Sequence, residues 1–264
     1  MRRLRQAFLS FLNKVPFYGL SIVCGDDPHL RLMLGRITRR KVTYGFANHN
    51  TYQITSYLPK DGGSECTVKF TGREGASLET LKLRVPGKHN VLNALATLAV
   101  ADELSIPREQ TLRGLWAFQG VQRRFQNRGE HSGVTFIDDY AHHPSEISAT
   151  LAAARERYPS SKIRVVFQPH RYSRVEDLFD RFSACFGQCD AIAVTDIYAA
   201  GESPIPGVHS QVLVENIRRH GPVDARYSEG PMLAVEEWLK ESAPGDIILT
   251  LGAGDLPNVY KQLF

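Results

Sequence analysis

No long hydrophobic run occurs in this sequence of 264 residues. No stretch approaches the roughly 20 consecutive apolar residues that a membrane-spanning helix needs, so we expect no membrane segment. Hydrophobic residues make up 42% of the chain and charged residues 23%, which is the balance of a soluble globular protein. A chain of this length has room for one large domain or two ordinary ones.

Cysteine is scarce, and the whole sequence contains only Cys24, Cys66, Cys185 and Cys189. Cys185 and Cys189 share a segment of helical character, and no second closely spaced pair accompanies them. This pattern argues against a zinc site and against a disulfide framework, and it favours buried thiols. Because free thiols suit a reducing compartment, we expect a cytoplasmic protein.

Several functional motifs are also missing. The sequence has no G-x-x-x-x-G-K-S/T phosphate loop, no G-x-G-x-x-G after its first apolar strand and no hydrolase elbow. Basic and aromatic residues do not alternate as they do in proteins that bind single-stranded nucleic acid, so we expect no nucleic-acid partner. The net charge of +4 fits an anionic small substrate equally well and decides nothing alone.

The first part of the chain, up to about residue 118, has a mixed pattern. An amphipathic helix is predicted at residues 2–14 and a long apolar helix at residues 91–104. Between these helices the sequence predicts strands at residues 20–24, 42–46, 52–57, 67–70 and 81–85, with a turn at Asp61-Gly62-Gly63.

The second part of the chain alternates strictly between strands and helices. Runs rich in valine and isoleucine at residues 134–139, 163–168, 191–196, 223–227 and 247–251 alternate with helices that begin near Pro144, Val175, Ser210, Pro231 and Leu256. Continuous apolar runs are typical of strands covered on both faces, and the alternation predicts an open, mostly parallel, Rossmann-like α/β sheet. We therefore expect two α/β domains, at residues 1–118 and 119–264.

In such a sheet, ligands bind beyond the carboxyl ends of the strands. Four unusual segments follow predicted strands, at residues 138–143, 168–174, 196–202 and 252–255. In the first, carboxylates and imidazoles at Asp138, Asp139, His142 and His143 could hold a ribose hydroxyl, a magnesium shell or a nucleophile. The alternative interpretation of this segment is a polar turn with a helix cap.

The second segment and two further sites carry basic or amide groups. His170, Arg171 and Arg174 can grip a carboxylate or phosphate, although a solvated basic loop has the same composition. Arg123-Arg124, at the expected domain boundary, could reach a nucleotide phosphate. Asn90 and Asn93 follow a glycine at a helix start; their side-chain amides suit an adenine edge, but an ordinary helix cap remains open.

Together these segments resemble the Mur ligase family. The matching stretches are PFYGLSIVCGDDP, GKHNVLNALA, GVQRRFQ, IDDYAHHPSEI, VVFQPHRYSRVEDLF, IYAAGESPIPGV and LTLGAGD. The resemblance implies that residues 1–118 are the C-terminal part of a central ATPase-type α/β domain and residues 119–264 the Rossmann-like C-terminal domain. The stretches favour the branch that joins L-alanine to UDP-N-acetylmuramate in peptidoglycan precursor synthesis, with ATP and Mg²⁺ as cofactors and an acyl phosphate intermediate.

The resemblance also implies roles for individual residues. It implies that His89, Asn90 and Asn93 contact adenine. It also implies that Arg123 contacts a nucleotide phosphate and that Asp139 contacts the ribose. Tyr140 and His142 would line the reaction centre, and His170, Arg171 and Arg174 would bind the carboxylate of alanine or of the muramoyl intermediate. We therefore expect the catalytic residues to be Tyr140, His142, Arg171 and Arg174.

The family's UDP-binding domain and its phosphate loop, with the main metal ligands, have no counterpart in this sequence. We expect the isolated chain to be inactive, its first domain to expose apolar edge surface and self-associate, and residues 119–264 to fold alone. Two other functions remain open. The first is the sister ligase that recycles murein peptides, and the second is a module that binds nucleotide or amino acid without catalysis.

Overall fold

The structure, a computed structural model, describes residues 2–72 and 75–264. The chain divides into two compact units, Met1–Gln119 (unit 1) and Gly120–Phe264 (unit 2). Among the helices that lie in these described ranges, none is both long and apolar enough to cross a membrane. The four cysteines are free thiols, and all but Cys24 are buried.

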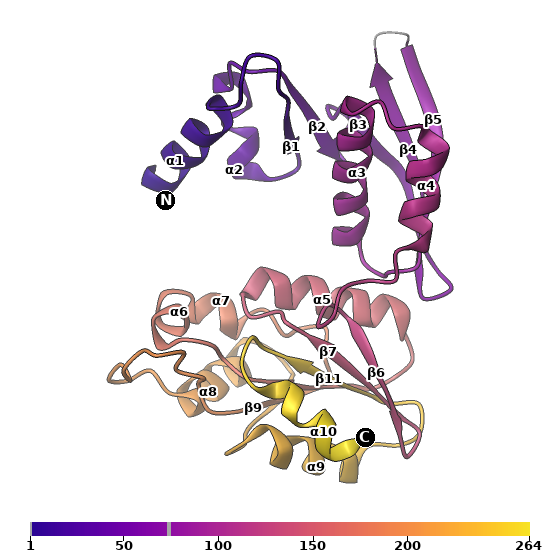
Figure 1. The fold of residues 1–264 in the computed structure, drawn as a ribbon. Helices are drawn as coiled ribbons and strands as arrows, with labels where there is room; N and C mark the ends of the chain where they lie inside the picture. Colours follow the sequence, from indigo (N-terminus) through magenta and orange to yellow (C-terminus); the bar gives the residue numbers. More distant parts are fainter. Residues whose placement is uncertain (1, 73–74) are drawn as a thin grey trace. The chain divides into compact units, whose positions relative to one another are not determined.

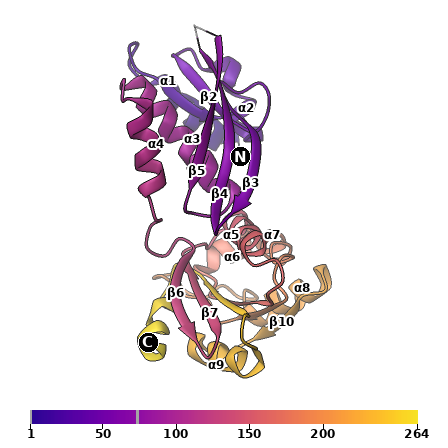
Figure 2. The ribbon, with the colours of Figure 1, turned by 90° about the vertical axis from the view of Figure 1, so that its right-hand side faces the viewer.

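Unit 1 contains one mixed sheet. Its strands are β1 (Ser21–Cys24), β2 (Lys41–Gly45), β3 (Tyr52–Lys60), β4 (Gly63–Gly72) and β5 (Gly75–Leu83), in that spatial order. The first three run parallel, whereas β3, β4 and β5 form long antiparallel hairpins that lie side by side in Figure 2. Asp61 and Gly62 make the β3–β4 turn with φ values of 50° and 75°, at the position predicted for a turn.

Helices pack on both faces of this sheet at β1. On one face, α3 (Lys88–Glu103) and α4 (Arg108–Ala117) pack over a core that includes Val68, Leu81, Leu95 and Leu98. At β1, Ile22 faces this core, while Val23 faces a smaller cluster with α1 (Arg2–Asn13), α2 (Pro28–Arg31) and the 3-10 turn η1 (Leu34–Arg36). Adjacent residues of a strand point to opposite faces, so β1 is covered on each side.

Strand β1 is nevertheless an edge strand, and the apolar face of α1 is only partly covered. Leu9 is buried in the small cluster, but Phe11 of α1 is 69% exposed, and Phe17, which follows the helix, is 80% exposed. Exposed aromatic side chains next to an unpaired parallel edge are a recognised site of association. Self-association through unit 1 therefore stays a prediction, with these residues as its physical basis.

Unit 2 contains a six-stranded sheet with the order β10-β9-β8-β11-β7-β6. The strands are β6 (Gln126–His131), β7 (Val134–Asp139), β8 (Ile163–Phe167), β9 (Ala191–Val194), β10 (Asp224–Tyr227) and β11 (Ile247–Leu251). All pairs are parallel except β6 with β7, which are antiparallel. The predicted mostly parallel α/β architecture is confirmed, while β6 is an additional strand that the sequence did not reveal.

The sheet of unit 2 is covered on both faces (Figure 1). One core joins it to α5 (Pro144–Arg157), α7 (Phe179–Ser183) and α8 (Ser210–His220); α6 (Tyr172–Asp177) precedes α7. The other core joins it to α9 (Pro231–Glu241), the 3-10 turn η2 (Leu256–Asn258) and α10 (Tyr260–Leu263). Every residue of β8, β9 and β11 is buried, which explains why these strands are apolar apart from Arg164 and Thr250.

Candidate active site

Four loops follow the carboxyl ends of neighbouring strands in unit 2. Strands β9, β8, β11 and β7 lie next to one another, so the segments at residues 196–202, 168–174, 252–255 and 138–143 emerge along one edge. The loops are bonded to each other: Tyr198 N donates to Pro169 O at 2.8 Å, and Gly252 N donates to Asp139 O at 3.2 Å. The predicted site segments of unit 2 thus share one edge of the sheet.

The loop after β8 presents a group of hydrogen-bond donors. The Arg174 guanidinium donates to His170 O at 3.0 Å and lies 3.2 Å from His170 Nδ1. Burial, with Arg174 next, lowers the pKa of His170, so the ring is neutral at neutral pH. Because Nδ1 faces a guanidinium, it accepts, and the ring proton resides on Nε2. The half-exposed Arg171 adds a second guanidinium beside this pair.

Glu202, from the neighbouring loop, braces this group. Its carboxylate accepts from Ser173 N at 3.0 Å and from Ser173 Oγ at 2.7 Å, at the start of α6. These hydrogen bonds lower the pKa of Glu202, and Arg171 lies 3.9 Å away. Arg171 itself has φ of 72°, which is uncommon for a residue with a side chain. Glu202 lies in the segment at residues 196–202 that the sequence selected, but no feature of the sequence predicted its hydrogen bonds with Ser173.

A row of rings links the two central loops. Tyr198 stacks on His170 with a centroid distance of 5.4 Å and an interplanar angle of 15°. His170 lies 6.0 Å from His142, which in turn meets the edge of Tyr140 at 5.2 Å. The structure therefore brings the predicted reaction-centre residues Tyr140 and His142 beside the predicted carboxylate-binding residue His170.

The loop between β7 and α5 serves two structural purposes. His143 caps α5 through its Nδ1, which accepts from Ser145 N, and Glu146 Oε2 accepts from the backbone N–H of His142 and of His143. The cap interpretation of this segment is therefore realised at His143. His142 Nδ1 lies 2.9 Å from Tyr140 O. The carbonyl can only accept, so a neutral His142 carries its proton on Nδ1 and leaves Nε2 as an acceptor.

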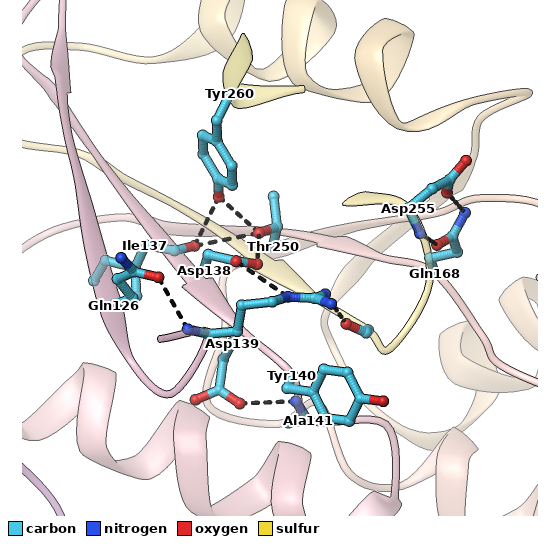
Figure 3. A network of polar contacts seen from close by, with 12 residues as sticks. Gln126, Ile137, Asp138, Asp139, Tyr140, Ala141, Gln168, Thr250, Asp255 and Tyr260 are labelled. Atoms are coloured by element: carbon cyan, nitrogen blue, oxygen red, sulfur yellow. Dashed lines mark hydrogen bonds and ion pairs between the residues drawn. The ribbon is translucent and has the colours of Figure 1, made fainter. Parts of the chain in front are cut away.

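Asp139 is almost fully buried, and its carboxylate is occupied by backbone donors. Phe125 N donates to one oxygen and Ala141 N to the other, each at 2.8 Å. Figure 3 shows the Asp139 carboxylate directed at Ala141. Burial raises the pKa of the Asp139 carboxyl. Asp139 thus holds the loop in shape, and its ribose contact stays a prediction.

The two adjacent arginines at the start of unit 2 are placed differently. The Arg123 guanidinium donates to Gly252 O at 2.6 Å and lies 4.8 Å from the Tyr140 ring centroid, over its face. Arg124 is half-exposed, and its nearest carboxylate, that of Glu146, is 4.0 Å away. Sequence reasoning selected Arg123, whereas Arg124 is the arginine with the more accessible guanidinium.

The selected residues of unit 1 lie on the first turns of α3. Gly87, with φ of 92°, precedes the helix, and the Asn90 amide donates to Pro86 O at 2.8 Å. Asn93 is exposed one turn later, and His89 is partly exposed. The N-cap position itself is Gly87, which has no side chain, so neither asparagine caps the helix. Asn93 is left facing solvent and Asn90 holds the entry to α3.

The loops after β1 and β2 meet the same end of α3. The Asp26 carboxylate accepts from Phe46 N at 2.6 Å and from Ala47 N at 3.1 Å. The Lys88 ammonium lies 6.0 Å from the Phe46 ring centroid. Sequence reasoning missed Asp26, because its hydrogen-bond partners lie about twenty residues away along the chain.

No complete metal site is present in the part of the chain that the structure describes. Within residues 2–72 and 75–264, no three histidine, cysteine, aspartate or glutamate side chains are grouped so that they could hold a metal ion. The two carboxylates at the end of β7, Asp138 and Asp139, are buried and engaged in internal contacts. The described residues therefore do not supply a magnesium shell by themselves, and the metal ligands stay unassigned.

Comparison with known proteins identifies the family. Residues 123–254 match the glutamate ligase domain of Mur ligases, and residues 1–101 match the Mur ligase middle domain. The chain belongs to the Mur ligase family. This confirms the family predicted from the sequence.

Curated relatives and solved structures agree with this assignment. The chain is 48% identical to the UDP-N-acetylmuramate–L-alanine ligase of Sorangium cellulosum over 99% of this chain and 55% of that protein. It is 44% identical to the ligase of the same name from Geobacter sulfurreducens, over 97% and 55%. The crystal structure of UDP-N-acetylmuramate-alanine ligase MurC from Thermotoga maritima matches with a TM-score of 0.76 and 27% identity, over 99% and 54%. The chain thus spans about half the length of these relatives.

Proposed function

We propose that this Mur ligase chain provides the amino-acid-binding part and part of the nucleotide-binding part of an ATP-dependent ligase that joins L-alanine to UDP-N-acetylmuramate. The observation that carries the proposal is the donor group at the carboxyl edge of unit 2. His170, Arg171 and Arg174 lie there beside His142 and Tyr140. The names of relatives more than 40% identical supply the substrate.

In this proposal the two guanidinium groups bind the carboxylate of L-alanine. Arg174 is held by His170, while Arg171 is half-exposed, so a carboxylate can receive charge-assisted hydrogen bonds from both. His170 adds its Nε2–H as a third donor. A small amino acid bound in this way would direct its amine along the row of rings toward His142.

The chemistry is an acyl transfer. ATP converts the muramoyl carboxylate into an acyl phosphate, and the alanine nitrogen attacks the acyl carbon. The carbon–oxygen bond to phosphate then breaks, inorganic phosphate leaves, and an amide remains. His142 Nε2, left as an acceptor by the bond between Nδ1 and Tyr140 O, would take the proton from the attacking amine. Magnesium, when bound, would neutralise phosphate charge.

Nucleotide contacts are proposed in both units. In unit 1 the amides of Asn90 and Asn93, with His89, would bind the adenine edge. In unit 2 Asp139 would contact the ribose and Arg123 a phosphate. We add Arg124 to the phosphate contacts, because its guanidinium is the more exposed of the pair. A cytoplasmic location follows in the proposal, since ATP is the phosphoryl donor and the thiols are free.

A chimeric enzyme tests the complete function. The N-terminal part of the Sorangium cellulosum ligase that this chain does not cover is fused ahead of residue 1, and phosphate release is measured with ATP, Mg²⁺ and UDP-N-acetylmuramate. We expect release that depends on L-alanine and is abolished by Arg174→Ala. Release that depends on a tripeptide instead would identify the sister ligase of peptide recycling.

The isolated chain gives the complementary measurement. We expect no alanine-dependent phosphate release from it, but binding of ADP and of L-alanine by isothermal titration calorimetry. A chimera that is silent while the chain binds both ligands would favour a binding module without catalysis. Absence of binding to either ligand, together with a silent chimera, would refute the proposed function.

A further inference from the structure

The segment that enters unit 2 has an unusual backbone. Arg123 and Phe125 have φ values of 57° and 47°, and Gly120 has φ of 102°. Two non-glycine residues in the left-handed region within three positions cost free energy, so the surroundings must hold them there. The exposed Arg124 lies between these two residues, so the same constraint sets where its side chain projects.

Two hydrogen bonds donated by main-chain amides attach the segment to the loop after β7. Tyr140 N donates to Arg123 O at 2.7 Å, and Phe125 N donates to the side-chain oxygen Asp139 Oδ2 at 2.8 Å. Arg123 N donates to Gln126 Oε1 at 2.9 Å. The backbone of the entry segment and the position of Tyr140 are therefore mechanically linked.

The Arg123 side chain extends this linkage into the sheet. Its Nη2 donates to Gly252 O, and its Nε lies 3.4 Å from Asp138 Oδ2. Neither the Nε nor this carboxylate oxygen has a hydrogen-bond partner elsewhere in the described chain. Arg123 Nε and Asp138 Oδ2 are therefore each other's only polar partners among the described residues, and the Asp138 side chain is completely buried.

Two hydroxyl groups hold the other oxygen of Asp138 in place. Its Oδ1 accepts from Thr250 Oγ1 at 2.9 Å, and that hydroxyl lies 2.7 Å from the Tyr260 hydroxyl. Figure 3 shows Asp138, Thr250 and Tyr260 converging on one point, with Tyr260 reaching down from α10. A rigid chain of contacts thus runs from α10 through β11 and β7 to Arg123.

We propose that Asp138 is a positioning residue that, by holding Arg123, fixes the entry segment so that Arg124 is set for nucleotide binding and the Tyr140 ring keeps its place in the reaction centre. The inference rests on the proposed function. Asp138 does not touch the nucleotide in this arrangement and acts only through Arg123. A buried carboxylate is expensive to keep, and burial raises its pKa, so packing alone would be served better by a neutral residue.

The variant Asp138→Asn tests the proposal, with Asp246→Asn as a matched control. Asp246 forms the other buried aspartate–arginine pair of unit 2, with Arg164 at 2.6 Å, at the opposite, amino-terminal edge of β8 and β11. Both variants remove a buried charge pair and both are expected to lower the melting temperature. Only Asp138→Asn is expected to alter the entry segment.

Two measurements on the full chain separate positioning from stability. In calorimetric titrations, Asp138→Asn should weaken ADP binding about tenfold, the size expected when Asp138 and the contacting Arg123 act on binding together. It should leave L-alanine binding unchanged, because the alanine-binding group is on other loops. Hydrogen exchange at the Phe125 and Tyr140 amides should become faster in Asp138→Asn and stay unchanged in Asp246→Asn.

Each outcome decides the question. Unchanged ADP affinity in Asp138→Asn, or an equal loss in Asp246→Asn, overturns the proposal. If the unaltered chain does not bind ADP, the nucleotide part of the proposed function fails. Hydrogen exchange then decides on its own whether Asp138 holds the entry segment, since faster exchange at Phe125 and Tyr140 supports the hold and unchanged exchange refutes it.

Discussion

Replacing Asp139 with asparagine is the sharpest test of how the loop after β7 is built. The carboxylate accepts from Phe125 N and Ala141 N at 2.8 Å each, and the side chain is 4% exposed. Asparagine keeps one acceptor oxygen but places an NH₂ group against the other backbone N–H. A buried donor without a partner costs about 1–3 kcal/mol. For a unit of this size, that lowers the melting temperature by about 3–9 °C.

The assay uses tryptophan fluorescence. Trp116 lies in unit 1 and Trp238 is buried in unit 2, so a Trp116→Phe background leaves Trp238 to report unfolding of unit 2 alone. Asp196→Asn is the control, because Asp196 is exposed at the same edge and asparagine keeps an acceptor for the Tyr227 hydroxyl. This change should cost no more than about 0.5 kcal/mol.

The alanine variant sharpens the result. Asp139→Ala leaves both backbone donors without a partner, so its loss should be about twice that of Asp139→Asn. If both Asp139 variants melt within about 1 °C of the Asp196→Asn control, the two hydrogen bonds do not hold the loop and the reasoning is wrong. A loss of ADP affinity in Asp139→Asn without a loss of stability would instead favour direct contact with the ribose.

Further variants test the rest of the site. Arg174→Lys removes the planar donor fork and should weaken L-alanine binding about tenfold or more in calorimetry, with an unchanged melting temperature; equal affinity would remove Arg174 from the carboxylate site. The pKa of His170 is lowered by burial and by Arg174, so the unfolded chain takes up its proton first as the pH falls. Neutral His170 thus contributes its full stabilisation above about pH 6.5, and this contribution is lost as the pH falls through the folded pKa. Toward about pH 5.5, the urea midpoint of His170→Gln should therefore fall less steeply than that of the unaltered chain. Gly252 has φ of 154°, and a Cβ there would lie 2.8 Å from Gln168 O; Gly252→Ala should lower the urea midpoint by the equivalent of about 1–3 kcal/mol, and an unchanged midpoint would show that the loop can shift.

The comparison of the two units shows where sequence patterns are informative. The bounds of β7 and β11 agree with the predicted runs at residues 134–139 and 247–251, because strands buried on both faces are mostly apolar. The buried polar residues Asp138, Asp139 and Thr250 fall near the carboxyl ends of these runs. Strand β6 was missed for the opposite reason. Its sequence, QNRGEH, is polar, it lies at the edge of the sheet, and the pairing shifts near Gly129, so neither alternation nor an apolar run marks it.

The long hairpins of unit 1 show an intermediate case. The sequence predicted strands at residues 67–70 and 81–85, whereas β4 and β5 are ten and nine residues long, from Gly63 to Gly72 and from Gly75 to Leu83. Only part of each strand packs against α3, and the remainder is stabilised by pairing with its neighbour. Local hydrophobicity reveals the packed part and is silent about the rest.

The sequence by itself determined the family, the strand–helix order of unit 2 and the four loops in which the candidate site lies. These features follow from local composition, from the period of the apolar residues and from long ordered motifs. The sequence also selected His142, His170, Arg171 and Arg174, since a strand end followed by such residues is unusual in any fold.

Only the tertiary structure decided which contacts each residue makes where two like-charged residues are adjacent in the sequence. Arg123 turns inward to Asp138 and Gly252 while Arg124 stays exposed, and Asp139 is occupied by backbone donors. Gly252 is 129 residues from its partner Arg123. The direction in which a side chain turns depends on the free energy of such distant contacts, and no local pattern in a single sequence records them.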